Sequence, residues 1–178
     1  GGDNTTNGDN GDDANTEGKK VKVGFITLHD ENSTYDLNFI NGAKEAIAAL
    51  GLTEDDYILK TNVPEGQECY EAAMDMVDAG CNIIFADSFG HEPYMIDAAK
   101  ENPDVQFCHS TGVRAHTEGL SNYHNAFASI YEGRYLAGIA AGMKLNEMIE
   151  NGTEINGTKV TAENAKIGYV GAFTYAEV

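Results

Sequence analysis

The chain has 178 residues, a hydrophobic fraction of 42% and a formal net charge of −18. This length and apolar content suit one or two folded domains and exclude an intrinsically disordered chain. The negative charge disfavours nucleic acid and anionic membrane surfaces as partners, because both repel it. The chain contains no run of 18 apolar residues, which a membrane-spanning helix would need.

The first segment, residues 1–18, consists almost entirely of Gly, Asp, Asn and Thr. Such a stretch buries too little apolar surface to offset the entropy lost on ordering, so we expect a disordered polar leader. A leader of this kind would serve as a spacer between a membrane anchor and a folded domain.

Strands and helices alternate after the leader. Short apolar runs rich in β-branched residues predict strands over 21–28, 57–63, 81–87, 105–110 and 120–127. Apolar residues at helical spacing predict helices over 37–50, 67–78, 94–101 and 130–149. Gly51 and Gly80 are expected to end the first two helices. Tyr70, Ala73, Met74 and Val77 are expected to share the apolar face of the second.

This alternation predicts an α/β fold, with a doubly wound parallel sheet and helices on both faces. We assign the sheet and its helices to a lobe over 19–150, followed by a crossover loop over 151–165. Residues 165–173 (AKIGYVGAF) echo the first strand. We therefore expect residues 166–178 to hold the first strand of a second, truncated lobe.

In an open parallel sheet, ligands bind where the carboxyl ends of the strands meet. Tyr35 and Phe89 follow two of these strands and offer flat faces for stacking on a ring. The loops also supply hydroxyl, carboxylate and amide groups that could orient a polar heteroaromatic ligand, and glycines that allow close backbone approach. The candidate ligand-binding residues are Asp30, Asn32, Ser33, Thr34, Tyr35, Ser88, Phe89, Gly90, His109, Thr111 and Gly112.

Other kinds of site find less support in the sequence. No phosphate-binding GxxxxGK[ST] or GxGxxG motif and no GxSxG nucleophile motif occurs. A metal site would draw on His29, His91, His109, His124, Asp30 and Asp87, but their spacing is irregular, and we expect no metal and no cofactor. Cys69, Cys81 and Cys108 show no CxxC spacing and are interpreted as small buried hydrophobes, although a disulfide between two of them stays open.

Several longer segments resemble a known family. They include STYDLNFINGAKEA, DSFGHEPYMIDAAKENPDVQFCHSTG, NYHNAFASIYEGRYLAGIAAGMKL and KIGYVGAF. These are similar to the basic membrane protein family of lipoprotein receptors for ABC transporters, also called the purine-nucleoside receptor-like family. The resemblance covers the chain from about residue 20 to its end.

The resemblance implies a two-lobed receptor of the periplasmic-binding-protein type I class that clamps a purine base or nucleoside between its lobes. It also implies an extracytoplasmic lipoprotein anchored to the cell membrane, an ABC transporter permease as partner, and no catalysis. In the subgroup associated with adenine-type bases, an aromatic residue precedes the Thr-Tyr pair, whereas Ser33 stands there in this chain.

Two other functions remain open at this point. The same fold serves as the ligand-sensing domain of signalling receptors. A nucleoside-processing enzyme is a further alternative, and it would need an acid/base pair such as Asp30 and His91.

Overall fold

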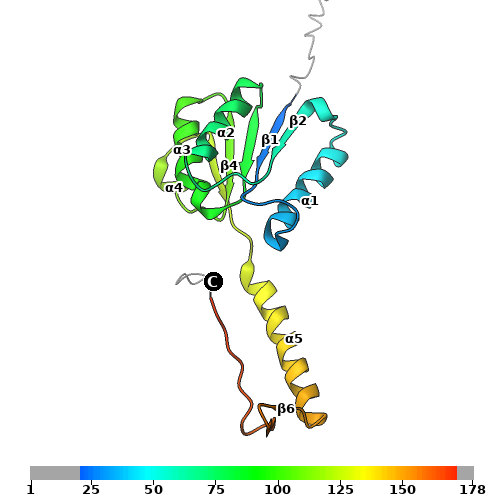
Figure 1. The fold of residues 1–178 in the computed structure, drawn as a ribbon. Helices are drawn as coiled ribbons and strands as arrows, with labels where there is room; N and C mark the ends of the chain where they lie inside the picture. The colour runs from blue at the N-terminus through cyan, green and yellow to red at the C-terminus, as the bar shows by residue number, and fades with distance from the viewer. Residues whose placement is uncertain (1–20, 172–178) are drawn as a thin grey trace, which may run out of the picture. The chain divides into compact units, whose positions relative to one another are not determined.

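The computed structural model describes residues 21–171. A five-stranded sheet forms its centre, with strand order β2-β1-β3-β4-β5 and every neighbouring pair parallel (Figure 1). The strands are β1 (Val23–Ile26), β2 (Tyr57–Lys60), β3 (Ile83–Ala86), β4 (Gln106–Ser110) and β5 (Tyr123–Ala126). All five predicted strands are present. The predicted leader over 1–18 lies outside the described residues.

Helices connect the strands in the predicted order, except that a short helix between β4 and β5 was not predicted. They are α1 (Thr34–Ala49), α2 (Gln67–Asp78), α3 (Glu92–Glu101), the short α4 (Ala115–Glu118) and α5 (Ile130–Glu150), with 3-10 turns η1 (Glu54–Asp56) and η2 (Phe89–His91). Gly51 and Gly80 follow α1 and α2 with φ of +65° and +87°, the left-handed conformation that glycine adopts without strain. Their predicted role as helix stops is confirmed.

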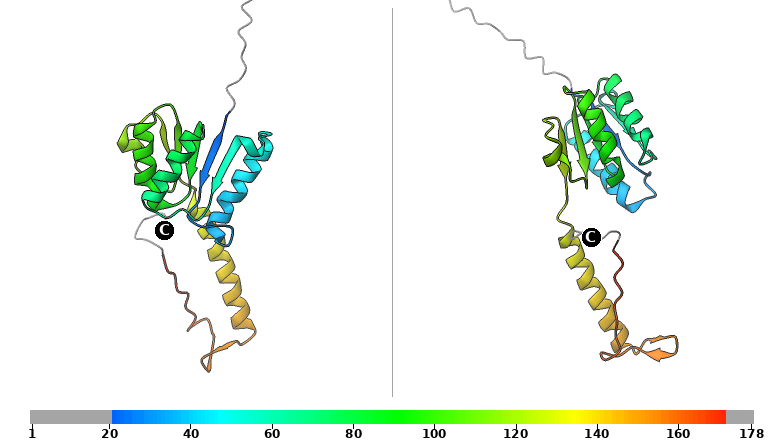
Figure 2. Two further views of the ribbon diagram at one scale, coloured as in Figure 1. Left: turned by 45° about the horizontal axis from the view of Figure 1, so that its top comes forward. Right: turned by 90° about the vertical axis from the view of Figure 1, so that its left-hand side faces the viewer.

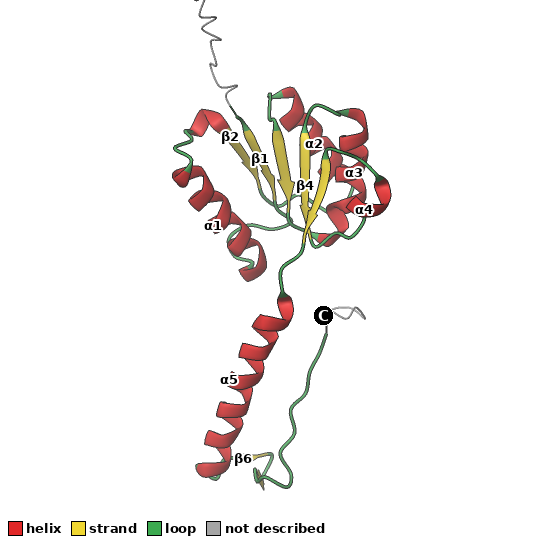
Figure 3. Ribbon diagram, turned by 180° about the vertical axis from the view of Figure 1, so that it is seen from behind, coloured by secondary structure: helices red, strands yellow, loops and turns green. Residues whose placement is uncertain are grey.

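Helices α2 and α3 cover one face of the sheet, and α1 lies over the other (Figures 2 and 3). Ile26, Ile84 and Phe107 belong to the buried core that α2 and α3 complete. Alternate side chains on β1 and β3 point to the opposite face, where Phe25 stacks on Phe85 with ring centroids 5.6 Å apart. A cavity of about 460 Å³ lies on this second face, lined by residues of α1 and of the sheet. The doubly wound arrangement is therefore as predicted.

The apolar face of α2 is displaced from its prediction. The buried residues are Cys69, Ala72, Ala73 and Met76. Of the predicted face only Ala73 is fully buried, while Tyr70, Met74 and Val77 pack partly buried against the same core. The small Cys69 and Ala72 let α2 approach the sheet closely, and Met76 contacts the position of Gly24, where a Cβ would overlap its sulfur.

Contacts within the chain define two compact units, with a boundary between Ala126 and Phe127. α5 groups with the second unit, whereas the predicted lobe extended to residue 150. None of the described residues of α5 is buried. The predicted crossover loop contains a small antiparallel hairpin of β6 (Glu154–Ile155) and β7 (Thr158–Lys159).

The strand predicted over 165–173 does not form in its described part. Residues 165–171 carry no strand assignment, and residues 172–178 lie outside the described range. A strand requires a neighbour for its backbone N–H and C=O groups, and within 21–171 none pairs with this segment. Its place as the first strand of a second lobe stays a prediction.

The three cysteines are free thiols, with Cys69 and Cys81 buried and Cys108 half-buried. Burial raises the pKa of Cys69 to about 12, so this thiol stays protonated and behaves as a small hydrophobe, as predicted. None of the helices in the described part of the chain combines the length and apolarity that crossing a membrane requires.

Candidate ligand-binding site

The candidate site lies at the carboxyl ends of β1, β3 and β4. β1 and β3 are neighbours, but β1 leads to α1 and β3 leads to α3, which cover opposite faces of the sheet. The chain therefore diverges between these two strands, and parallel sheets bind ligands at such a switch point. The loops that meet there are residues 27–33, 87–91 and 111–114.

The loop after β1 is held by its own polar side chains. Asp30 accepts hydrogen bonds from the backbone N–H of Asn32 at 3.0 Å and from Asn32 Nδ2 at 2.9 Å. These bonds from Asn32 lower the pKa of Asp30, so the half-buried carboxylate is charged at neutral pH. Ser33 caps α1 and its hydroxyl accepts from the backbone N–H of Asp36. Ser33 and Thr34 therefore build the helix start on which Tyr35 is presented.

Tyr35 occupies the first turn of α1 and leaves 46% of its surface exposed. Its hydroxyl donates to the backbone carbonyl of Asp87, the residue after β3, at 2.9 Å. Its ring lies 5.0 Å from the ring of Phe39 in a tilted arrangement. These two contacts fix the tyrosine between the first and third strand ends, with part of its ring available to a ligand.

The loop after β3 carries Ser88, Phe89 and Gly90. Ser88 is buried and its hydroxyl donates to the carboxylate of Glu65, which also accepts from the backbone N–H of Gly90 at 2.8 Å. Phe89 is 37% exposed. The hydroxyl of Ser88 is therefore already bonded to Glu65, while the ring of Phe89, at the start of η2, is partly exposed.

The loop after β4 is packed internally. His109 is buried, and its Nε2 donates to the backbone carbonyl of Ser88 at 2.6 Å. Burial lowers the pKa of His109, so the ring is neutral at neutral pH. Thr111 has a left-handed φ of 71°, and its buried Oγ1 finds no hydrogen-bond partner among the described residues. A Cβ at Gly112 would overlap Glu92, His109 and Asn125, so this glycine is required by packing inside the protein.

Glu92 on α3 holds the loop after β4 through hydrogen bonds to its backbone. Its buried Oε1 accepts from the backbone N–H groups of Val113 at 2.9 Å and Arg114 at 2.8 Å, and from the hydroxyl of Tyr123 at 3.2 Å. Asn125 adds a second support, because its Oδ1 accepts from the backbone N–H of Ala115 at 2.7 Å. The loop is therefore held by side chains from α3 and β5.

Two buried carboxyl groups lie directly under the first two loops. Asp36 is 1% exposed and Asp87 is 3% exposed. Asp36 accepts from the backbone N–H of His29 at 2.9 Å and from the hydroxyl of Ser33. Asp87 accepts from the backbone N–H of Leu28 at 3.2 Å through one oxygen, and its other oxygen has no donor in the described structure.

The structure separates the predicted residues into two groups. Asn32, Thr34, Tyr35 and Phe89 are exposed and Asp30 is half-buried, while Ser33, Ser88, Gly90, His109, Thr111 and Gly112 build or brace the loops around the switch point. Sequence reasoning missed Glu65, Asp36 and Glu92 as supports. Asp36 had a detectable signal, since it stands three residues after the capping Ser33, as acidic residues do in capping boxes.

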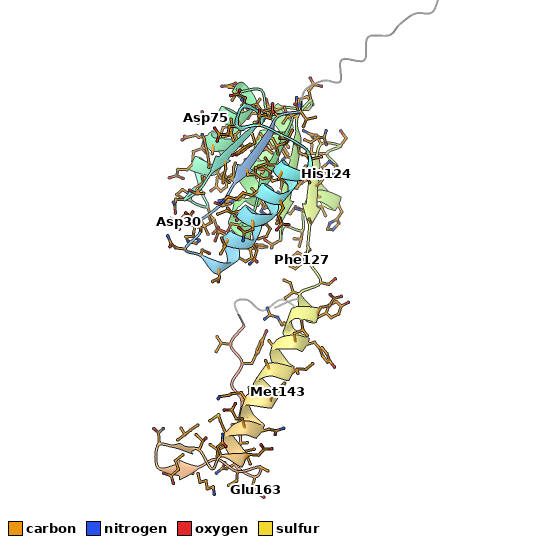
Figure 4. The ribbon with its side chains drawn as sticks, turned by 90° about the vertical axis from the view of Figure 1, so that its right-hand side faces the viewer. Asp30, Asp75, His124, Phe127, Met143 and Glu163 are labelled. Atoms are coloured by element: carbon orange, nitrogen blue, oxygen red, sulfur yellow. The ribbon has the colours of Figure 1, made fainter. Side chains whose placement is uncertain are left out.

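The histidines and acids that could have formed a metal site or an acid/base pair do not converge. In the described part of the chain no three His, Cys, Asp or Glu side chains are placed to hold one ion. Figure 4 shows Asp30 on the loop leading into α1 and His124 on β5, on opposite sides of the sheet unit. His91 is fully buried with Nε2 donating to the carbonyl of Val63 at 2.9 Å, so it does not face a substrate together with the half-buried Asp30.

Comparison with known proteins gives two kinds of match at the level of sequence. A family model described as ABC transporter substrate-binding protein, PnrA-like, matches residues 23–173. A purine-binding protein of Brucella abortus is 36% identical over 126 residues, which are 69% of this chain and 34% of that protein. A Haloferax volcanii protein named as an ABC transporter glucose-binding protein is 37% identical over 97 residues, 54% of this chain and 19% of its own length. The chain thus spans about a third or less of these relatives.

Among solved structures, a solute-binding protein of an ABC transporter system from Conexibacter woesei matches with a TM-score of 0.53 and 17% identity. The match covers 62% of this chain and 36% of that protein. At this identity the likeness concerns the fold alone, and it agrees with the parallel α/β sheet described above.

Proposed function

Because the chain belongs to the PnrA-like family of ABC transporter substrate-binding proteins, we propose that it forms the first ligand-binding lobe of a receptor that delivers a purine base or nucleoside to an ABC transporter. Tyr35 and Phe89 carry this proposal. Their exposed rings stand in the first turn of α1 and in η2, which follow the neighbouring strands β1 and β3 at the switch point of the sheet, where they can contact a planar ligand.

Polar groups beside the rings would fix the orientation of the ligand. The charged Asp30 carboxylate can accept hydrogen bonds from the amino or ring N–H groups of a purine, or from ribose hydroxyls. The similarity to the purine-binding protein of Brucella abortus supports a purine as ligand.

The proposed mechanism is closure of two lobes around the ligand, without any bond made or broken. The ligand binds the first lobe and then contacts the second, so the closed state is stabilised by contacts that the open state lacks. The closed receptor would be recognised by the membrane permease. Family members of this class act outside the cytoplasm, and we propose that a lipid anchor on the membrane side of the polar segment 1–18 holds this receptor at the cell surface.

A sugar is the second candidate ligand. The Haloferax relative is named as a glucose-binding protein, and aromatic faces flanked by carboxylate and amide groups also suit a pyranose ring. A signalling role for the same lobe would show as ligand binding without dependence of uptake on the receptor.

A thermal-shift screen of the full-length receptor against purine bases, nucleosides, sugars and amino acids tests the proposal. A ligand present at 100 times its Kd stabilises the folded state by about 2.7 kcal/mol, which gives a clear shift. We expect shifts with purines only. The shift should fall to about half or less in Tyr35→Ala, because a tenfold weaker ligand is then present at about 10 times its Kd, and it should be retained in a control such as Glu71→Ala on the exposed face of α2. A shift with glucose and none with any purine would replace the purine by a sugar.

A further inference from the structure

A pair of buried carboxyl groups, Asp36 and Asp87, accepts hydrogen bonds from the backbone N–H groups of two consecutive residues, His29 and Leu28. Asp36 stands in the first turn of α1 and Asp87 directly follows β3. Asp87 also holds Tyr35 through its backbone carbonyl. A change in this pair therefore reaches the residue that we propose to meet the ligand.

The pair has little positive charge to balance it. In the part of the chain that the structure describes, the one ion-pair partner of the two carboxyl groups is His29, whose Nδ1 lies 3.2 Å from Asp36 Oδ2 and whose side chain is 59% exposed. Among the ion pairs of the described residues, none involves Asp87. Two neighbouring carboxylates removed from water repel each other strongly, and such pairs retain a proton.

The surroundings decide which carboxyl group keeps that proton. Burial opposes ionisation of Asp36, but hydrogen bonds from Ser33 and His29 outweigh it and lower the pKa of Asp36 to about 2. Burial, followed by the charge of Asp36, raises the pKa of Asp87 to about 7. Asp87 Oδ2 is buried and receives no hydrogen bond from any described residue, so it is the oxygen on which a retained proton would sit.

We propose that Asp87 is a positioning residue of the ligand site, which in its protonated form donates a hydrogen bond from Oδ2 to the Asp36 carboxylate and so ties the start of α1 to the end of β3. Only the link to ligand binding rests on the proposed function. The shared proton itself is a property of the folded lobe.

The other titratable groups around the pair supply no positive charge that could take the place of this proton. Cys69 on α2 is a neutral thiol, because burial raises its pKa to about 12. His91 is neutral at neutral pH, because burial lowers its pKa. Glu65 adds a further negative charge, since its hydrogen bond from Ser88 lowers its pKa. Deprotonation of Asp87 would thus place two carboxylates close together, and the first turn of α1, which carries Tyr35, would be held less firmly.

The sign of the pH effect follows from the raised pKa. The unfolded value is 3.8 and the folded value is about 7, so the stabilising contribution is complete below the unfolded value and is lost as pH rises through about 7. Ligand affinity should weaken in the same range, by about tenfold for the loss of one hydrogen bond to a charged group.

The test compares the full-length receptor with Asp87→Asn, using adenine as the probe. The asparagine amide can donate to Asp36 at every pH while its carbonyl still accepts from Leu28. Between about pH 6 and pH 8.5, we expect the thermal midpoint of the ligand-free wild type to fall relative to that of Asp87→Asn, and the wild-type Kd for adenine to rise about tenfold while the Kd of Asp87→Asn stays constant. The buried His91 and His109 are present in both proteins, so their contribution cancels in this comparison. His29→Gln serves as control and should keep the wild-type profile, because it changes a neighbour of the pair and leaves both carboxyl groups in place.

Each readout has a distinct meaning. Equal pH slopes of the ligand-free midpoint in wild type and Asp87→Asn, or a slope of His29→Gln equal to that of Asp87→Asn, would overturn the shared proton. A wild-type midpoint that falls relative to that of Asp87→Asn, without adenine binding by either protein at any pH, would support the pair and reject adenine as the ligand. If Asp87→Asn does not fold, infrared titration of the wild type decides, since a protonated carboxyl band that disappears with a midpoint near 7 is expected and its absence at pH 6 would contradict the proposal.

Discussion

The backbone amide of Gly90 donates to Glu65 Oε1 at 2.8 Å, across 25 positions of sequence. The same carboxylate accepts the hydroxyl of Ser88. The turn after β2 therefore braces the loop after β3, on which Phe89 stands. Because Glu65 is itself exposed, this brace can be altered with little effect on the core.

Replacement of Gly90 by alanine should disturb ligand binding more than folding. A Cβ at this position would lie 2.5 Å from Glu65 Cδ, so the carboxylate must swing out and release Ser88 and Gly90. We expect a stability loss of about 1 kcal/mol and an affinity loss of about tenfold, measured by urea unfolding and calorimetric titration. Gly42→Ala on α1, where a Cβ meets nothing within 4 Å, is the matched control and should leave the affinity unchanged. Unchanged affinity in Gly90→Ala would argue against a role for the brace.

Glu92 should behave as a structural residue. Its replacement by alanine leaves the N–H groups of Val113 and Arg114 and the hydroxyl of Tyr123 without their acceptor. We expect a loss of about 3 kcal/mol in the free energy of unfolding, from the desolvation cost of these buried donors. Glu92→Gln keeps an acceptor oxygen and should cost less than half as much. Equal losses for the two variants would show that the charge, rather than the acceptor, holds the loop.

Two substitutions separate the roles of Tyr35. Tyr35→Phe removes the hydrogen bond to the Asp87 carbonyl and should cost about 1 kcal/mol of stability while retaining most of the ligand affinity. Tyr35→Ala also removes the ring and should weaken binding of a planar ligand about tenfold or more. The affinity ratio of the two variants, measured by calorimetry, isolates the stacking contribution. A ratio near one would exclude stacking at this position.

The buried His91 and His109 should lower the free energy of unfolding as pH falls below neutral. Burial lowers the pKa of His91 and of His109 below the unfolded value of 6.5. Their stabilising contribution is therefore present above the unfolded value and is lost as pH falls through the folded values. Urea unfolding between pH 7 and about pH 5 should show a shallower loss for His109→Gln than for the wild type. His124→Gln, on the exposed side of the neighbouring strand, should keep the wild-type slope, and the same slope in both variants would contradict this assignment.

Local signals predicted the order of the elements well. The helix over 67–78 was predicted with the bounds that α2 has, because Gly66 and Gly80 punctuate both of its ends. The strand predicted over 165–173 does not form in its described part, because an apolar run specifies a strand only where another strand supplies hydrogen bonds.

The candidate site was predictable in position but not in its supports. Tyr35 and Phe89 could be placed together because parallel strand ends converge at one edge of the sheet. Ser88 and His109 were predicted to contact ligand, but the structure gives their polar atoms partners within the protein. Such pairings join residues more than 20 positions apart and leave no trace in local spacing.

Calorimetric titration of the full-length receptor with its purine ligand tests the central claim most directly, when the wild type is compared with a double variant, Tyr35→Ala with Phe89→Ala. Loss of both rings should weaken binding about 100-fold, since each stacking contact contributes on the order of 1 kcal/mol or more. The thermal midpoint without ligand should change little, because both side chains are partly exposed. Unchanged affinity in a folded double variant would contradict the placement of the ligand at the switch point between β1 and β3.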